Sequence, residues 1–334
     1  MVDEAQLLAD RWRSEAGERP TVDVSADMLE LASRTIGRIL YGSDMATALP
    51  QVMRFDYINE EMLRRSVSRH PMPIWVPTPA NRKLKDGLRV LRQLVTDIIT
   101  ARRAQGSEGA RDDMLGLLLT ARDLEEDSGP LTDEEVIDQV LVFMLAGHDT
   151  TSTTLACSLV ELARHPVWQQ KVQEELQQEL GDRPPSAQDA THLPWTGRVA
   201  REAMRLYPAS HSIGRSPIGD QVVGGYLLPA GSTIVVSTYA LHRSLDSWDR
   251  PDEFDPGRYD LADGAVPGGH KQAWMAFGSG PHTCVGMTLA TQMVTVVLAT
   301  LLQQVQLSTA LTSVPVHASM TLRPAGALPV EVNR

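Results

Sequence analysis

The stretch Phe277-Gly-Ser-Gly-Pro-His-Thr-Cys-Val-Gly286 presents a single cysteine, Cys284, near the end of a glycine-punctuated loop. It has no alternating apolar pattern, so it does not predict a strand. Its inner glycines and its proline favour tight turns that bring backbone N–H groups round toward the sulfur. From Val285 onward the sequence predicts a mostly buried helix, which places Cys284 at a helix N-terminus. Peptide dipoles and unpaired amides at such a position favour a thiolate.

Two roles are open for this cysteine. A thiolate held in this way is a good axial ligand for haem iron and donates electron density that favours O–O cleavage, and Phe277 is placed to cover the sulfur. Alternatively, Cys284 is an ordinary buried cysteine, since free cysteine is among the most buried residue types. Cys157 lies in an apolar helix and is expected in the core. Two cysteines without a Cys-x-x-Cys pair argue against a zinc site or a disulfide framework, and fit a reducing, cytoplasmic setting.

Composition narrows the class of protein. The chain has 334 residues and is 42% hydrophobic, enough to bury the core of one large domain or two. A formal net charge of −11 argues against binding to nucleic acid or to anionic lipid, because either partner requires a basic surface. The first residues lack the features of a signal peptide or membrane anchor, and the most apolar window, 140–146, is too short to span a bilayer. We therefore expect a soluble chain.

The order of elements predicts a mainly α fold with a minor β portion. Residues 28–41 and 84–104 have the apolar spacing of helices, and they flank a proline-rich connection at 71–79. A polar, glycine-containing stretch follows at 106–113. Two β-like runs, 222–228 and 233–238, are separated by Pro229-Ala-Gly231 and together suggest a small sheet. No linker divides the chain, so residues 1–334 are predicted to form one domain.

A long helix is the second informative feature. Thr132 and Glu135 form a capping box, and no proline follows until Pro166, so a helix of about 32 residues and roughly 48 Å is predicted. Its middle, Ala146-Gly-His-Asp-Thr-Thr-Ser152, replaces the expected core residues with small and polar ones. This pattern predicts a groove in the surface of the helix, next to a flat group. The alternative is a polar stripe with Gly147 as a packing notch.

Both features resemble motifs of one family. The pattern Phe-x-x-Gly-x-x-x-Cys-x-Gly is similar to the haem-binding loop of the cytochromes P450, and the long helix resembles their distal helix, which borders the oxygen site. On this resemblance Asp149 and Thr150 are the acid and the alcohol that deliver protons to bound dioxygen, and Cys284 is the axial ligand of the haem iron. The other implied cofactor-binding residues are Phe277, Gly278, His282, Gly286, Arg215, Ala146 and Gly147.

A third motif is Glu202-Ala-Met-Arg205. An i,i+3 pair of this kind is usually a solvated salt bridge of little energetic value. The downstream segment 251–259 resembles the part of a P450 that closes a Glu-Arg-Arg network, with Arg258 as its third member. The family commonly has Glu and Phe on either side of that arginine, whereas this chain has Gly257 and Tyr259. The implied role is structural, to hold the loop that presents Cys284.

The haem propionates require cations. Arg215 and His282 occupy positions where P450s commonly place these partners, although His282 is equally consistent with a solvent-facing loop residue. The segment around His242 and Arg243 also resembles the family and is read as structural. The resemblance runs from about Val22 to the segment 321–324. It implies that roughly a hundred N-terminal residues of the family plan are absent and that the P450-like fold is N-terminally truncated.

The resemblance implies a haem-thiolate monooxygenase of the bacterial, soluble kind. It would use haem b and O2, with electrons from NAD(P)H delivered through a ferredoxin or flavodoxin-type donor and its reductase. The substrate is expected to be an apolar small molecule, such as a terpenoid or polyketide intermediate of secondary metabolism, with Met144, Leu145, Ala146 and Ile213 facing its cavity. The alternatives are a haem-binding module without turnover and an incomplete, haem-free fragment that acts as a structural protein. A proton relay at Asp149 and Thr150 argues against a mere binder.

Overall fold

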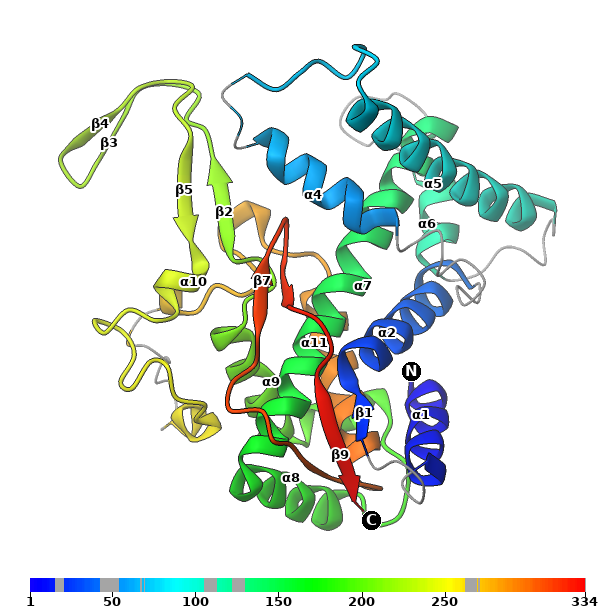
Figure 1. Cartoon of the computed structure of the whole chain (residues 1–334), viewed down its shortest axis with the longest axis vertical. Coiled ribbons are helices and arrows are strands. Elements are labelled where there is room, and N and C mark those ends of the chain that lie inside the picture. Colours follow the sequence, from blue (N-terminus) through cyan, green and yellow to red (C-terminus); the bar gives the residue numbers. More distant parts are fainter. Residues whose placement is uncertain are drawn as a thin grey trace.

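The computed structural model describes residues 1–15, 21–42, 54–66, 68, 70–104, 113–121, 130–261, 269 and 271–333. Apart from Asp113, the polar stretch predicted at 106–113 lies outside these residues. Helices dominate the described parts of the chain (Figure 1). Their bounds are α1 Val2–Glu15, α2 Val24–Tyr41, α4 Arg54–Ser66, α5 Pro79–Ala104, α6 Met114–Thr120, α7 Asp133–Arg164, α8 Pro166–Glu179, α9 Pro194–Leu206, α10 Thr238–Leu241 and α11 Met287–Leu302. Short 3₁₀ turns occur at Ala187–Thr191, Pro256–Tyr259, Lys271–Ala273 and Gly280–His282.

Helix α7 runs through the middle of the molecule (Figure 1). It has the predicted 32 residues, and its capping box is present: the Thr132 N–H donates to the Glu135 carboxylate at 2.7 Å, and the Glu135 N–H donates to Thr132 Oγ1 at 3.3 Å. Pro166 begins α8 directly after the C-terminal cap. The side chains from Thr151 to Ala163 are buried without a break. Because buried side chains occupy every face of this half of the helix, other elements enclose it on all sides.

Helix α2 packs along α7, and a glycine sets their separation. An added Cβ at Gly147 would lie 3.1 Å from Ile36 Cγ2, so the close approach depends on the missing side chain. Gly147 therefore serves as a packing notch against α2, and its role beside a cofactor remains a prediction. Asp23 caps the start of α2 by accepting a hydrogen bond from the Ser25 N–H at 3.0 Å.

Within the residues that the structure describes, the β structure is spread over four small antiparallel sheets rather than one. They are the three-stranded sheet β1 (Thr21–Asp23), β9 (Pro329–Asn333) and β6 (Gln306–Ser308), and the pairs β2 (Ser212–Arg215) with β5 (Ile234–Ser237), β3 (Gln221–Val223) with β4 (Tyr226–Leu228), and β7 (Val316–Ala318) with β8 (Leu322–Pro324). In the first sheet, Val22 lies opposite Val330, so a segment near the start of the chain is joined to one near its end.

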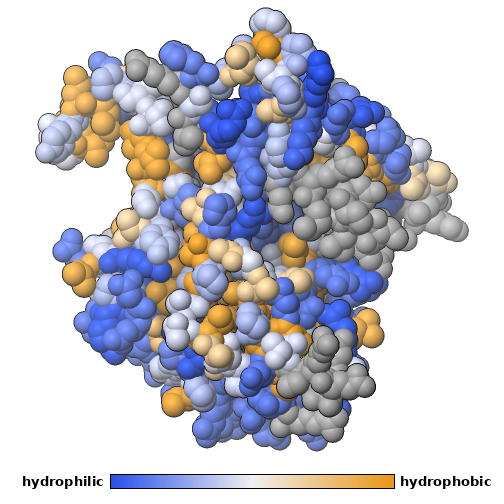
Figure 2. Space-filling view, viewed as in Figure 1, coloured by the Kyte–Doolittle hydropathy of each residue, from blue (hydrophilic) through white to orange (hydrophobic). Residues whose placement is uncertain are grey.

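The predicted pairing of 222–228 with 233–238 is wrong. The first run is itself a hairpin, because Gly224 and Gly225 turn the chain at φ 58° and 84°. The second run, β5, pairs with β2 instead. The β3–β4 hairpin projects from the body and carries exposed apolar side chains (Figures 1 and 2). These are Val222, Val223, Tyr226 and Leu227.

Helix α11 begins two residues later than predicted. Gly286 is its N-cap, and Met287 is its first residue. Glycine favours the turn over the helix at this point, and the Met287 N–H donates to the Cys284 carbonyl at 3.3 Å. The second half, residues 293–302, is fully buried, as predicted, and the helix packs against α1, α7 and α9. Among the described helices, none has the length and apolar character needed to cross a membrane.

Candidate functional site

The loop before α11 presents Cys284 as an exposed side chain. Gly278 and Gly280 adopt φ 75° and 77°, a region that favours glycine. The Gly278 N–H donates to the Met275 carbonyl at 3.0 Å, and the Cys284 N–H donates to the Phe277 carbonyl at 2.9 Å. These amides therefore close the loop on itself and do not point at the sulfur, which corrects part of the predicted geometry. The burial predicted by the ordinary-core alternative is also wrong.

Gly286 and Phe277 are the two neighbours of this cysteine in the predicted motif. An added Cβ at Gly286 would lie 3.8 Å from Cys284 Sγ, so the sulfur lies close to the backbone of this glycine. Phe277 is half-buried and packs on Trp274, with ring centroids 5.9 Å apart and planes at 59°. The structure thus places Phe277 against Trp274, and its covering of the sulfur remains a prediction.

One face of α7 is partly open, and it carries Ala146 and Thr150. The Thr150 hydroxyl donates to the Ala146 carbonyl at 2.8 Å, the back-bonding expected of threonine within a helix. Leu145 is half-buried, whereas Met144 is only 4% exposed and belongs to the hydrophobic core. Met144 lies on the other side of α7 from Ala146, because two residues along a helix turn by about 200°. The structure therefore does not place Met144 at an open cavity, contrary to expectation.

Asp149 points away from Thr150. Its side chain is 7% exposed, and its carboxylate accepts a hydrogen bond from the hydroxyl of Thr321, which directly precedes strand β8 of the C-terminal hairpin. Consecutive helical residues are about 100° apart, so the acid and the alcohol project from different faces of α7. Sequence reasoning missed Thr321, because nothing in the local pattern links two residues 172 positions apart.

Glu202, Arg205 and Arg258 form one cluster. Arg205 Nε and Nη2 donate to the Glu202 carboxylate at 2.8 and 2.9 Å, and Arg258 Nε donates to the same carboxylate at 2.8 Å. Glu202 and Arg205 are fully buried. The remaining donors of Arg205 bond to the carbonyls of His242, Pro251 and Glu253. The guanidinium therefore joins α9 to the segment that precedes the cysteine loop.

The two departures from the family pattern have a structural explanation. Tyr259 donates its hydroxyl hydrogen to Glu202 at 3.1 Å and so becomes a further member of the cluster. An added Cβ at Gly257 would lie 3.0 Å from the ring of Trp168 and 2.9 Å from Asp255 Oδ1, so this position has no room for a side chain. The sequence signal for this role of Tyr259 was its hydroxyl group, which the phenylalanine common at this position in the family lacks.

His242 connects this cluster to the cysteine loop. It is fully buried, and the Met275 N–H donates to its Nε2 at 2.8 Å. Its Nδ1 therefore carries the proton and donates to the Arg205 carbonyl at 3.1 Å. Burial, with the charges of Arg205 and Arg243, lowers the pKa of His242 to about 4. Three hydrogen bonds thus run from Arg205 through His242 and Met275 to Gly278, in agreement with the structural role expected of His242.

The two cations expected for an anionic cofactor are both exposed. Arg215 lies at the end of β2, and its guanidinium bonds only to the Gly214 carbonyl, at 2.8 Å, within the described parts of the chain. His282 lies in the cysteine loop. Ile213, also on β2, is half-buried opposite Val236 of β5.

Comparison with known proteins decides the family. The model of the cytochrome P450 family matches residues 1–326. The chain belongs to the cytochrome P450 family. The match begins upstream of Val22, where the sequence resemblance was expected to start, and therefore includes α1. The packing of α1 against α11 is consistent with its being part of the P450 fold.

Two of the relatives are named as oxygenases. Pentalenene oxygenase of Streptomyces avermitilis is 34% identical over 297 residues, which cover 88% of this chain and 63% of that protein. Cyclooctat-9-en-7-ol 5-monooxygenase of Streptomyces melanosporofaciens is 35% identical over 272 residues, which cover 81% of this chain and 58% of that protein. This P450 chain thus spans about three fifths of the length of these relatives.

A solved structure bears out the fold. The heme domain of cytochrome P450DA has a TM-score of 0.86 and 28% sequence identity, and the likeness covers 100% of this chain and 72% of that chain. The prediction of a mainly α, P450-like fold with a minor β portion is therefore confirmed.

P450 proteins take haem, and the residues of this chain fit that cofactor. Cys284 is the exposed cysteine of the two, so its sulfur is accessible to a metal. Arg215 has no carboxylate partner among the described residues and is available to an acidic group. Val236, exposed on β5 opposite Ile213, offers apolar surface that a flat hydrophobic group would cover, whereas Val235 projects from the other face of the strand. Cys284 would hold the iron, and Arg215 and His282 would bind the carboxylates.

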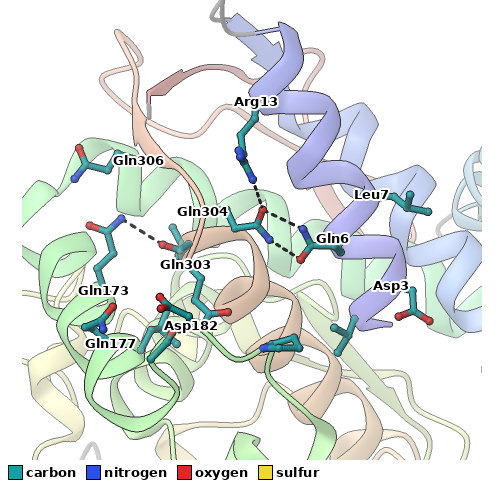
Figure 3. A pocket seen from close by; sticks show the side chains of 15 residues that line it. Asp3, Gln6, Leu7, Arg13, Gln173, Gln177, Asp182, Gln303, Gln304 and Gln306 are labelled. Atoms are coloured by element: carbon teal, nitrogen blue, oxygen red, sulfur yellow. Dashed lines mark hydrogen bonds between the residues drawn. The ribbon is translucent and has the colours of Figure 1, made fainter.

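A further cavity of the described structure lies elsewhere. It measures about 910 Å³ and opens between α1, α8 and the end of α11 (Figure 3). Gln6 and Gln304 exchange hydrogen bonds of 2.6 and 3.1 Å across it, and Arg13 donates to Gln304. Cys284 precedes the other end of α11, and a 16-residue helix is about 24 Å long. This cavity is therefore separate from the cysteine site of the P450 fold.

Proposed function

We propose that this chain is a haem-thiolate monooxygenase that oxidises an apolar small molecule. The observation that carries the proposal is the exposed Cys284, held by a self-bonded loop before α11. Because α11 packs against α7, this cysteine belongs to the same body as the open face of α7. Haem with a thiolate ligand would supply oxygen activation when bound. The protein's part would be to hold that cofactor, exclude water and deliver protons.

We assign proton delivery to Thr150 and Asp149. The Thr150 hydroxyl lies on the partly open face of α7 and can pass a proton through Oγ1, exchanging its present bond to the Ala146 carbonyl for one to another acceptor. Asp149, the preceding residue, has a buried carboxylate that can take a proton from the opposite side of the helix. Such positioned groups contribute about 10²–10⁴-fold to rate.

The substrate and partners follow from chemistry and from the relatives. Two relatives are named for pentalenene and cyclooctat-9-en-7-ol, and we propose a terpenoid of secondary metabolism as substrate. Half-buried Leu145 and Ile213, with exposed Ala146, would supply apolar contacts. Electrons would come from NAD(P)H through a ferredoxin or flavodoxin-type donor and its reductase. A cytoplasmic location is proposed from the two unpaired cysteines.

The experiment is a reduced, CO-treated absorption spectrum of the protein and two cysteine variants. Wild type should show the red-shifted Soret band of thiolate ligation. Cys284→Ser should lose that band even where haem is retained, whereas Cys157→Ala, which changes the buried cysteine, should keep it. An unchanged spectrum in Cys284→Ser would mean that the ligand is misassigned. Turnover with surrogate redox partners then separates an enzyme from a haem-binding module, and absence of any haem band would support a haem-free fragment.

A further inference from the structure

The hydroxyl of Thr321 is held by well-fixed backbone. The Ser319 N–H donates to the Thr321 carbonyl at 2.9 Å, which closes the β7–β8 turn. The adjacent Leu322 N–H donates to the Ala209 carbonyl at 2.8 Å, which ties the turn to the connection after α9. The hydroxyl that contacts Asp149 is thus set by two elements and does not depend on a flexible side chain alone.

Asp149 also lines a cleft of about 500 Å³ between α2, α7 and the β7–β8 hairpin. Its floor consists of buried residues of α7, including His148, Ser152 and Thr153. Its rim includes exposed His317 and the partly exposed Arg323.

Ser33 lines the α2 side of the same cleft. Its side chain is 5% exposed, and its hydroxyl has no hydrogen-bond partner within the described structure. A buried hydroxyl without a protein partner is a place where water is stabilised. The cleft therefore leads from the surface to Asp149 along groups that can order water.

We infer that Thr321 is a positioning residue that holds the Asp149 carboxylate at this cleft, where the acid takes up protons from solvent on the face of α7 away from Thr150. The inference rests on the proposed monooxygenase function. Asp149 would be loaded with a proton while bonded to Thr321, and a change of its side-chain rotamer would then carry that proton toward Thr150. Without the Thr321 hydroxyl, the carboxylate is no longer held toward the source of protons.

The test compares Thr321→Val, which keeps the shape and removes the hydroxyl, with Thr321→Ser, which keeps the hydroxyl. Turnover of Thr321→Val should fall about tenfold, with more reducing equivalents lost to peroxide and a larger solvent deuterium isotope effect, while substrate affinity stays within about twofold. Thr321→Ser should restore coupling. Thr312→Val is the matched control, since Thr312 is an exposed threonine of the same C-terminal region and its only bond in the described structure is made by its carbonyl.

A second readout does not depend on turnover. In protein labelled with ¹³C-aspartate, the infrared carboxylate band that disappears in Asp149→Asn should shift in Thr321→Val and stay in place in Thr321→Ser. Thr321→Ala serves in the same measurements where the valine variant fails to fold.

The outcomes distinguish a failure of the proposed proton relay from a failure of the role of Thr321. Normal coupling in Asp149→Asn would overturn the relay in the proposed function, and with it this role for Thr321. Impaired coupling in Asp149→Asn together with normal coupling and an unshifted band in Thr321→Val would overturn the inference about Thr321 alone.

Discussion

At the scale of single residues, Glu202 shows how hydrogen bonds and ion pairs stabilise a buried carboxylate. It accepts hydrogen bonds from two nitrogens of Arg205, from Arg258, from the Asp255 N–H and from Tyr259. Burial of a charge is costly unless its partners and hydrogen bonds are complete. The sequence motif predicted the three charged members. It did not predict the hydrogen bond from Tyr259, because the family commonly has phenylalanine at this position, and that pattern requires only an aromatic ring.

Removing the tyrosine hydroxyl should therefore destabilise the fold. Tyr259→Phe keeps the ring against Trp248 but leaves the Glu202 carboxylate one donor short. Hydrogen bonds to charged groups are worth about 1.5–3 kcal/mol, so we expect a loss of about 2 kcal/mol in the free energy of unfolding by urea. Tyr226→Phe, at an exposed tyrosine, should change it by less than about 0.5 kcal/mol. Equal effects in the two variants would contradict a special role for the Tyr259 hydroxyl.

At the scale of elements, helices were more predictable than strands. The start and end of α7 follow from local signals, a capping box and a proline. The pairing of β5 with β2 does not, since register depends on contacts between distant segments. The same holds for the site: the cysteine loop and the Glu202–Arg205 pair are local motifs, whereas the Thr321–Asp149 contact exists only after the hairpin has packed on α7.

The link between α9 and the cysteine loop predicts a particular pH dependence. His242 has an ordinary pKa of 6.5, which burial lowers to about 4 in the fold. Between these values the unfolded chain binds the additional proton, so this contribution to stability is complete above pH 6.5 and is lost as the pH falls toward 4. The shift corresponds to roughly 3 kcal/mol.

The measurement is the free energy of urea unfolding from about pH 4 to pH 7.5, in wild type and in His242→Gln. The variant should be less stable near neutrality and should lose less stability on acidification, because it has no imidazole to protonate. The difference between the two curves removes the effect of the carboxylates that both proteins share. Parallel curves would show that His242 does not cause the acid sensitivity.

At the scale of the whole molecule, segments far apart in sequence hold the P450 body together. Strand β1 pairs with β9, and α1 packs against α11 (Figure 1). The sequence predicted the presence of helices and of some strands, yet these closures could not be derived from composition or periodicity. These contacts depend on the shape of the packed helix surfaces and on the register of the paired strands, which are visible only in the folded chain.

The exposed apolar β3–β4 hairpin can cause association between copies of the protein in solution. A net charge of −11 keeps copies apart in dilute buffer. In about 1 M salt the screening length falls to about 3 Å, and the hairpins, with their exposed Val222 and Leu227, can meet. Light scattering should therefore report growing particle mass as salt is raised, and Val222→Lys with Leu227→Lys should abolish the growth. An unchanged particle mass in wild type would contradict association through the hairpin. If the mass grows as expected, the ionic strength of the buffer controls the solubility of the protein, and the β3–β4 hairpin limits the concentration at which it can be stored.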